Sequence, residues 1–243
     1  MASIVLVHGA WSEAAAWTHV TPLLSNAGHQ VAAPDLPAHG SDHTDPAEVT
    51  LDSYVGAVIA AAEQLAGPVV LVGHSMAGTV ISSVAESRPD LVAHLVYLAA
   101  FLLPSGQSLY GFTQSSPGMA ASALGPALRP GDGVLDVDPH QFIDVFCADA
   151  PTGLAQQALA ALRPDPLAPL GTPLTVTAER WGAIPRSYLH TDLDRCVSPA
   201  SQAEMVAAVG VATTRHLVAT HLAMLSHPAE VAAAIIDVSL TTH

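Results

Sequence analysis

One segment constrains the fold of this chain more than any other: residues 68–78 read Pro-Val-Val-Leu-Val-Gly-His-Ser-Met-Ala-Gly. An apolar strand runs directly into a turn of small residues, and helix-compatible sequence follows. Ser75 stands at the tip of this turn, where the chain bends so sharply that only small neighbours fit. The usual pattern is Gly-x-Ser-x-Gly, and here Ala77 takes the last place with Gly78 directly after it, a variant that adds one methyl group. We predict that Ser75 is presented at the carboxyl end of a sheet strand.

Strand and helix signals alternate along the rest of the chain. Short apolar runs separated by helical spacing predict an α/β fold with a mostly parallel central sheet and helices on both faces. The predicted strands are residues 4–7, 31–33, 69–73, 92–99, 174–177, 187–190 and 213–218, and the predicted helices are 14–26, 51–65, 77–87, 199–209 and 228–240.

The amino-acid composition changes between residues 104 and 169. This segment is rich in Gly, Pro, Ser and Ala and contains only short helical patterns. We predict that residues 1–103 and 170–243 form the core and that 104–169 form an inserted cap. Six apolar side chains are candidates to line a pocket for substrate: Trp11, Phe101, Phe112, Phe142, Phe146 and Leu222.

Composition excludes several classes of function. The formal net charge is −14, and all seven basic residues are arginine. No basic run is present to bind nucleic acid or an anionic membrane. A Walker phosphate loop and a pyridoxal Schiff base both need lysine, and are therefore excluded. Cys147 and Cys196 are expected to be free thiols. Residues 3–7 are expected to form a first strand rather than part of a leader, and the longest apolar run, residues 91–103, is too short to be expected to span a membrane. We expect a soluble, cytoplasmic protein that needs no cofactor.

A serine hydroxyl becomes a good nucleophile only when a base removes its proton and a carboxylate orients that base. His221 follows the last predicted strand and is the predicted base. Asp192 and Asp194 both follow the strand at 187–190. We predict Asp194 as the orienting acid because it begins the loop toward the next helix, with Asp192 as a solvated acid that caps a turn. No Cys or Glu joins His216, His221 and His227 at metal-ligand spacing, so no metal site is expected.

The tetrahedral intermediate of acyl transfer also requires two N–H donors for its oxyanion. One is expected from Met76, which follows the nucleophile at a helix N-terminus. The other is expected from Ala10, in the loop after the first strand. Both are backbone groups.

Taken together, these segments resemble one branch of the α/β-hydrolases. That branch contains bacterial carboxylesterases including pyrethroid hydrolases, plant methylesterases such as the salicylate-binding one, and the plant hydroxynitrile lyases. The resemblance implies that the second aspartate of Thr191-Asp192-Leu193-Asp194 is the triad acid. It rests on the strand and turn that present Ser75 (residues 68–78, the serine elbow) and on residues 5–11, 22–24, 27–29, 98–101, 191–194 and 221–226.

The differences from the lyases are informative. The lyases carry a lysine directly after the catalytic histidine and a threonine in the oxyanion loop, whereas this chain has Leu222 and Ala10. The resemblance therefore implies a serine carboxylic-ester hydrolase, and the largely apolar cap predicts that it acts on small to medium hydrophobic or aromatic esters. Lyase or acyltransferase chemistry at the same site, and a ligand-binding protein with low turnover, are the alternatives. The sequence leaves open the acyl and alcohol groups and the oligomeric state.

Overall fold

A computed structural model describes residues 1–240 of the chain. Its centre is a six-stranded sheet in which every neighbouring pair of strands is parallel, as the sequence predicts. In spatial order the strands are β2 (Gln30–Ala32), β1 (Ser3–Val7), β3 (Val69–His74), β4 (Val92–Leu98), β8 (Arg186–Thr191) and β9 (Thr213–Leu217). Strands β1, β3 and β8 are buried along their whole length, because helices cover both faces of the sheet.

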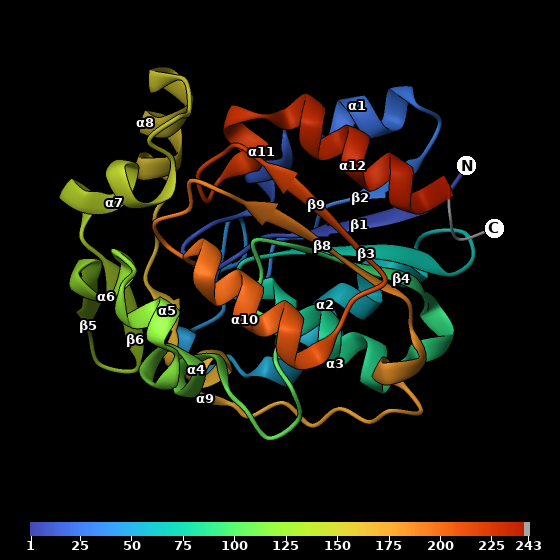
Figure 1. The fold of residues 1–243 in the computed structure, drawn as a ribbon, viewed down its shortest axis with the longest axis horizontal. Coiled ribbons are helices and arrows are strands. Elements are labelled where there is room, and N and C mark those ends of the chain that lie inside the picture. Colours follow the sequence, from blue (N-terminus) through green and yellow to red (C-terminus); the bar gives the residue numbers. More distant parts are fainter. Residues whose placement is uncertain (241–243) are drawn as a thin grey trace.

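The helices of the core form two layers, one on each side of the sheet (Figure 1). Helices α1 and α12 lie together on one side, and α2, α3 and α10 lie on the other. Their bounds are α1 Thr21–Asn26, α2 Leu51–Glu63, α3 Ala77–Ser87, α10 Pro199–Val209, α11 Ala223–Ser226 and α12 Pro228–Leu240. Four short 3-10 segments complete the core: η1 Ala14–Trp17, η2 Pro46–Glu48, η3 Pro89–Leu91 and η4 Trp181–Ala183. The expected α/β architecture is confirmed.

Strand order places a crevice at one point of the sheet. The chain runs outward from β1 to β2 and then returns to the other side of β1 with β3. The connections leaving β1 and β3 therefore diverge to opposite faces, and the carboxyl ends of these two strands open between them. Residues 8–11 follow β1 and residues 75–76 follow β3, so both loops lie at this opening.

Two of the predicted elements are wrong. Residues 14–26 form η1 and α1 with a break between them, because Pro22 lacks the N–H needed to continue a helix and starts α1 instead. Residues 174–177 form no strand. The Leu174 backbone bonds with the loop at Gly106 and Gln107, and Thr177 donates to the Glu86 carboxylate, so side-chain and loop contacts replace a sheet ladder.

The segment predicted as a cap lies at one end of the molecule, on the left of Figure 1. It contains six short helices and a small antiparallel sheet that the sequence does not predict. These elements are α4 Leu109–Ser115, α5 Pro117–Ala120, α6 Leu124–Ala127, β5 Leu128–Pro130, β6 Val134–Val137, α7 Pro139–Phe146, α8 Thr152–Ala160, β7 Asp165–Pro166 and α9 Leu167–Gly171. The strands are two to four residues long and two of them contain proline, too little for a periodicity of two to appear.

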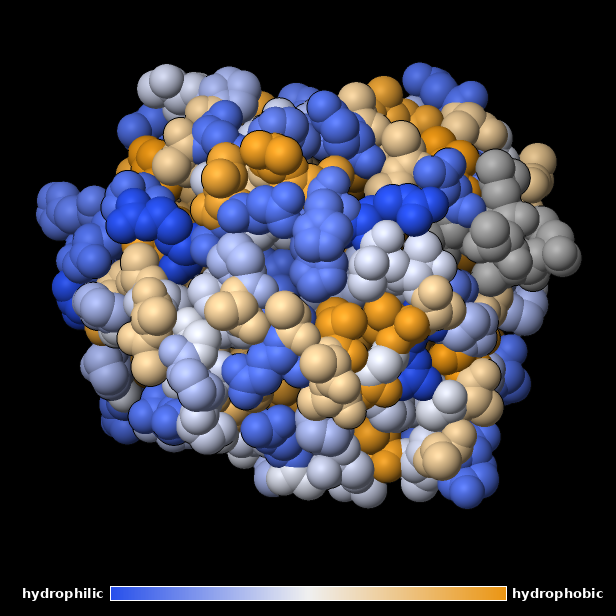
Figure 2. All heavy atoms as spheres, in the orientation of Figure 1, coloured by the Kyte–Doolittle hydropathy of each residue, from blue (hydrophilic) through white to orange (hydrophobic). Residues whose placement is uncertain are grey.

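Apolar side chains fill the interior, and the surface is mixed. On the face shown in Figure 2, apolar patches are separated by polar side chains. Both cysteines are buried free thiols, as expected. Within residues 1–240, no helix combines the length and the apolar character that crossing a membrane requires.

Several histidines are buried as neutral rings, and this makes folding stability depend on pH. Burial lowers the pKa of His94 to about 4, and burial together with nearby His39 lowers the pKa of His8 to about 3. Such a folded-state pKa lies below the unfolded value near 6.5. The unfolded chain therefore takes up protons first as the pH falls, and stability that is complete above pH 6.5 is lost toward pH 4.

We expect His94→Phe, which keeps a ring of similar size but cannot titrate, to reduce this acid sensitivity. Between pH 6.5 and 4.5 the slope of unfolding free energy against pH should become shallower by up to about 1.4 kcal/mol per pH unit, the value of one proton. Urea unfolding of the wild-type protein and the variant at four pH values between 4.5 and 6.5 measures this slope. An unchanged slope would show that His94 does not contribute, whatever the variant's stability at neutral pH.

Candidate active site

Ser75 occupies a strained turn between β3 and α3. Its φ is 55°, in the left-handed region that side chains other than glycine rarely adopt. Its N–H donates to the Leu98 carbonyl at 3.2 Å, and its carbonyl accepts from Phe101 N–H at 3.0 Å. These two bonds to the end of β4 hold the bend in place.

Crowding around this turn explains the variant at position 77. A Cβ atom on Gly73 would lie 2.8 Å from the Ala77 carbonyl oxygen, and one on Gly78 would collide with the Phe101 backbone. The two positions that require glycine are therefore 73 and 78. Ala77 has space for its methyl group, so the departure from the usual pattern costs little.

The loop after β1 packs directly against Ser75. A Cβ on Gly9 would come within 2.8 Å of the Ser75 Cβ, so only glycine allows this approach. The next residues, Ala10 and Trp11, line the cavity beside Ser75 together with Met76. Among residues 1–240, no protein acceptor faces the backbone N–H of Ala10 or of Met76. Both remain available to bind a negatively charged oxygen.

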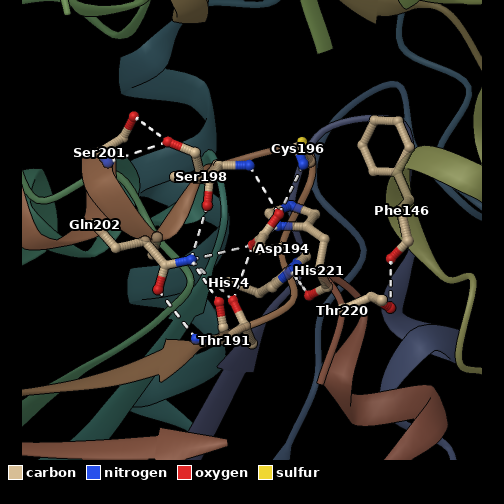
Figure 3. A network of polar contacts seen from close by, with 12 residues as sticks. His74, Phe146, Thr191, Asp194, Cys196, Ser198, Ser201, Gln202, Thr220 and His221 are labelled. Atoms are coloured by element: carbon tan, nitrogen blue, oxygen red, sulfur yellow. Dashed lines mark hydrogen bonds and ion pairs between the residues drawn. The ribbon is translucent and has the colours of Figure 1, made fainter. Parts of the chain in front are cut away.

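Asp194 is a buried carboxylate whose two oxygens have different partners (Figure 3). Its Oδ1 accepts from the N–H groups of Cys196 at 2.8 Å and Val197 at 2.9 Å. Its Oδ2 accepts from Thr191 Oγ1 at 2.9 Å and from His221 Nδ1 at 2.7 Å. These bonds hold the carboxylate rigidly against the imidazole.

Gln202, which sequence reasoning missed, locks the loop that carries Asp194. Its side chain is fully buried in α10, where its Oε1 accepts from Thr191 N–H and its amide donates to Asp194 Oδ2 at 3.3 Å and to the Val197 carbonyl at 2.8 Å (Figure 3). The available signal was the Ser198-Pro199 helix start, which places position 202 in the first turn, facing back to the loop.

His221 is oriented from both sides. A carboxylate only accepts, so the proton shared with Asp194 lies on Nδ1, and Nε2 is the ring nitrogen that this bond leaves free. His74, next to Ser75 in the chain, donates from Nε2 to the His221 carbonyl at 3.0 Å, and the two rings lie 4.6 Å apart. Burial, then the neighbouring His221, lowers the pKa of His74 well below its usual value, so it remains a neutral donor. These contacts bring His221 to the elbow.

Asp192 lies in a different environment. Its side chain is exposed and pairs with His216 Nδ1 at 2.8 Å, in contrast to the fully buried contact between Asp194 and His221. This is the solvated position that the sequence predicted for it.

The cap contacts the loop that carries His221. Asp149 accepts from Thr220 N–H at 2.9 Å and from the Thr220 hydroxyl, and the Phe146 carbonyl accepts from Leu222 N–H at 2.9 Å. The Phe146 ring also meets the His221 ring edge-on at 5.7 Å. Asp149 was not predicted, because nothing near it in the sequence shows which loop it would reach.

Two cavities flank Trp11 at the carboxyl edge of the sheet. The smaller, about 30 Å³, is mostly apolar and contains Ser75, Met76 and Phe101. The larger, about 160 Å³, contains His221 and reaches between the cap helices α7 and α8 and the segment η1. Ala10 and Trp11 border both.

The six apolar residues predicted to line a pocket are distributed unevenly. Phe142, Phe146 and Leu222 border the larger cavity, Phe101 borders the smaller, and Trp11 borders both. Phe112 packs edge-on behind Phe101 at 6.1 Å and borders neither. Within the part of the chain that the structure describes, no three His, Cys, Asp or Glu residues are grouped so that they could hold a metal ion.

Comparisons with known proteins agree with this architecture. Residues 4–234 match the protein-family profile described as the alpha/beta hydrolase family. A pyrethroid hydrolase of Sphingobium wenxiniae is 30% identical over 246 residues, which cover 96% of this chain and 86% of that protein. Salicylic acid-binding protein 2 of Nicotiana tabacum is 30% identical over 252 residues, which cover 97% of this chain and 96% of that protein.

A solved structure gives the same result. The crystal structure of a pyrethroid hydrolase from Sphingobium faniae JZ-2 superimposes with a TM-score of 0.89 at 30% identity, covering 97% of this chain and 96% of that one. Family profile, sequence relatives and structure thus agree over nearly the whole length. This chain belongs to the alpha/beta hydrolase family, among relatives that are named as hydrolases and esterases.

Proposed function

We propose that this protein is a cofactor-free serine carboxylic-ester hydrolase in which Ser75, His221 and Asp194 form the catalytic triad. The observation that carries the proposal is the buried 2.7 Å contact between His221 Nδ1 and Asp194 Oδ2, with His221 held against His74, the residue directly before the serine in the strained elbow. A strained serine and a carboxylate-oriented imidazole are the two components that acyl transfer through a serine needs.

The proposed reaction has two halves. His221 Nε2 takes the Ser75 proton as Oγ attacks the ester carbonyl, and the N–H groups of Ala10 and Met76 hold the resulting oxyanion. The imidazolium, stabilised by Asp194, then gives its proton to the departing alcohol. Water enters, loses a proton to His221, and attacks the acyl-enzyme by the same route. The carboxylic acid leaves and Ser75 is restored.

The positions of the two cavities indicate which part of the ester each one binds. The leaving alcohol must lie on the side of His221, which protonates it, and the larger cavity contains His221. The acyl group then extends into the smaller cavity beside Ser75. We infer esters with a short acyl group and a larger hydrophobic or aromatic alcohol.

Apolar surroundings favour hydrolysis over lyase chemistry. The residue after His221 is Leu222, buried against the larger cavity, and the chain contains no lysine that could hold cyanide. An uncharged leaving alcohol suits such a lining. The relatives named as methylesterases and pyrethroid hydrolase support an ester substrate.

The test is turnover of an ester panel with mass spectrometry of the quenched enzyme. Aromatic-alcohol acetates and butyrates should be hydrolysed, and a transient acyl adduct should map to Ser75. Release of aldehyde from a cyanohydrin, or product binding without turnover of any ester, would contradict the proposal.

The cavity assignment predicts opposite effects for two matched substitutions. Leu128 borders the smaller cavity and Leu154 the larger, and both are half-buried. Leu128→Ala should raise the ratio of kcat/KM for the octanoate ester to kcat/KM for the acetate ester about tenfold. The enlarged smaller cavity can bury more of the longer acyl chain, and each buried CH₂ contributes about 0.8 kcal/mol. Leu154→Ala should leave that ratio within twofold and instead favour bulkier alcohols. The reverse pattern would exchange the two subsites.

A further inference from the structure

A fully buried ion pair joins the cap to the loop next to Ser75. His39 Nε2 lies 2.9 Å from Asp165 Oδ2, and neither side chain is exposed. Asp165 belongs to the cap strand β7, whereas His39 lies in the core loop after β2. The same Asp165 oxygen also accepts the backbone N–H of Trp11 at 2.8 Å. One carboxylate oxygen therefore connects three separate segments.

The hydrogen bonds of His39 define its charge. Its Nδ1 faces the Pro37 carbonyl at 3.0 Å, and its Nε2 faces the Asp165 carboxylate. Both partners are acceptors, so both ring nitrogens carry protons. Burial alone would lower the pKa of His39, but the hydrogen bond and the charge of Asp165 raise it above the usual value. Its two acceptors thus hold His39 in the charged form.

Trp11 is held by the cap at both ends. Its indole Nε1 donates to the Leu135 carbonyl at 2.7 Å, and its backbone N–H donates to Asp165. Leu135 and Asp165 are directly paired across β6 and β7, so the two acceptors come from a single site in the cap sheet. The Trp11 φ of 55° is unfavourable for a bulky residue, and these bonds hold the backbone in that conformation.

The peptide groups on either side of the Ala10 Cα are both fixed. His8 Nδ1 donates to the Gly9 carbonyl at 2.9 Å, and that carbonyl belongs to the same peptide group as the Ala10 N–H. The following peptide group carries the Trp11 N–H that donates to Asp165. The His8 bond orients the peptide group that contains the Ala10 N–H, and the Asp165 bond fixes the Ala10 Cα from its other side, so the N–H keeps its direction only while both bonds are present.

We infer that Asp165, held by His39, is a positioning residue that aims the Ala10 N–H at the developing oxyanion, through its bond to Trp11 N–H. The inference rests on the proposed function and goes beyond it, because it assigns a catalytic consequence to a carboxylate of the cap. Loss of the acceptor frees the Ala10–Trp11 peptide to rotate. Relaxation of the strained Trp11 backbone then shifts the Ala10 Cα, and the Ala10 N–H, which is attached to it, turns away from the oxyanion. Trp11 keeps its place in the walls of both cavities because its indole Nε1 still donates to the Leu135 carbonyl, so KM changes little.

The test compares two substitutions at one position. Asp165→Ala removes the acceptor of Trp11 N–H, whereas Asp165→Asn can keep it with an amide oxygen. We expect Asp165→Ala to lower kcat by about 30- to 300-fold with KM within threefold, near the loss of one oxyanion donor. The kcat of Asp165→Asn should be at least tenfold higher than that of Asp165→Ala.

Glu204→Ala is the matched control. Its carboxylate also bridges core and cap by accepting from Ser116 Oγ at 2.5 Å, but it touches neither catalytic loop. We expect it to change Tm without changing kcat. If Asp165→Ala fails to fold because His39 is left unpaired, Asp165→Leu combined with His39→Phe replaces both charges and still removes the acceptor, with the same expected loss.

A second readout separates this inference from the proposed function. An aryl fluorophosphonate modifies an activated serine and develops the same oxyanion without requiring an ester substrate, and its rate is followed by intact mass. If the wild-type protein is neither modified nor hydrolyses esters, the proposed function fails. If Ser75 is modified and Asp165→Ala reacts within threefold of wild type, or if only its KM changes, the inference about Asp165 is wrong.

Discussion

Replacement of Ser75 by alanine should lower ester turnover by about 10⁴- to 10⁶-fold, the largest effect expected from any single substitution in this protein. The alanine side chain fits the same space but has no oxygen to attack the carbonyl. The remaining rate would come from the oxyanion donors and from His221 acting on water. Steady-state assays on p-nitrophenyl acetate and butyrate, with active-site titration of the wild-type protein, measure the ratio.

Ser83→Ala is a suitable control because Ser83 also lies in α3, where its hydroxyl only donates to the Thr79 carbonyl. It should retain full turnover. Circular dichroism of both variants shows whether the fold persists. A Ser75→Ala protein that keeps more than a tenth of the wild-type rate would show that hydrolysis does not pass through this serine.

The second large effect is expected from Asp194→Asn, with a loss of about 10⁴ in kcat, as for the loss of a triad carboxylate elsewhere. The amide keeps the shape of the carboxylate, and its oxygen can still accept from Cys196 and Val197. Its NH₂ group then faces His221 Nδ1, which must accept. The imidazole proton moves to Nε2, and the base has no lone pair for Ser75.

Asp192→Asn provides the matched comparison, since it makes the same chemical change two residues away. Asp192 is exposed and pairs with His216, so a change of less than threefold is expected. If the two results are reversed, Asp192 is the orienting acid. If neither variant loses activity, the imidazole of His221 does not need a carboxylate partner.

Much of the fold could be predicted because its signals are local. Strands β1, β3 and β4 are mostly apolar runs, and α2 has regular apolar spacing that begins at a Thr50–Ser53 capping box. The predictions failed where local signals conflicted or where the elements were very short. Pro22 interrupts a helical pattern, and the cap strands are too short to show alternation.

The candidate site divides in the same way. Ser75 could be predicted as the nucleophile because its turn has a sequence pattern, and His221 and Asp194 could be predicted as its partners because they follow strands in the expected order. Gln202 and Asp149 carry no such pattern. Each becomes interpretable only when folding brings it to a catalytic loop.

The amino-acid sequence alone thus predicts the strands and helices, the serine elbow and the candidate triad residues, since the pattern that marks each strand, turn or post-strand residue extends over only a few positions. Tertiary structure alone decides how the proposed catalytic groups are held. Asp165 reaches Trp11 across 154 positions and His39 across 126, and burial of that pair away from water makes its hydrogen bonds strong. The spacing of residues along the chain does not predict such contacts, because they arise from the way the cap packs on the core.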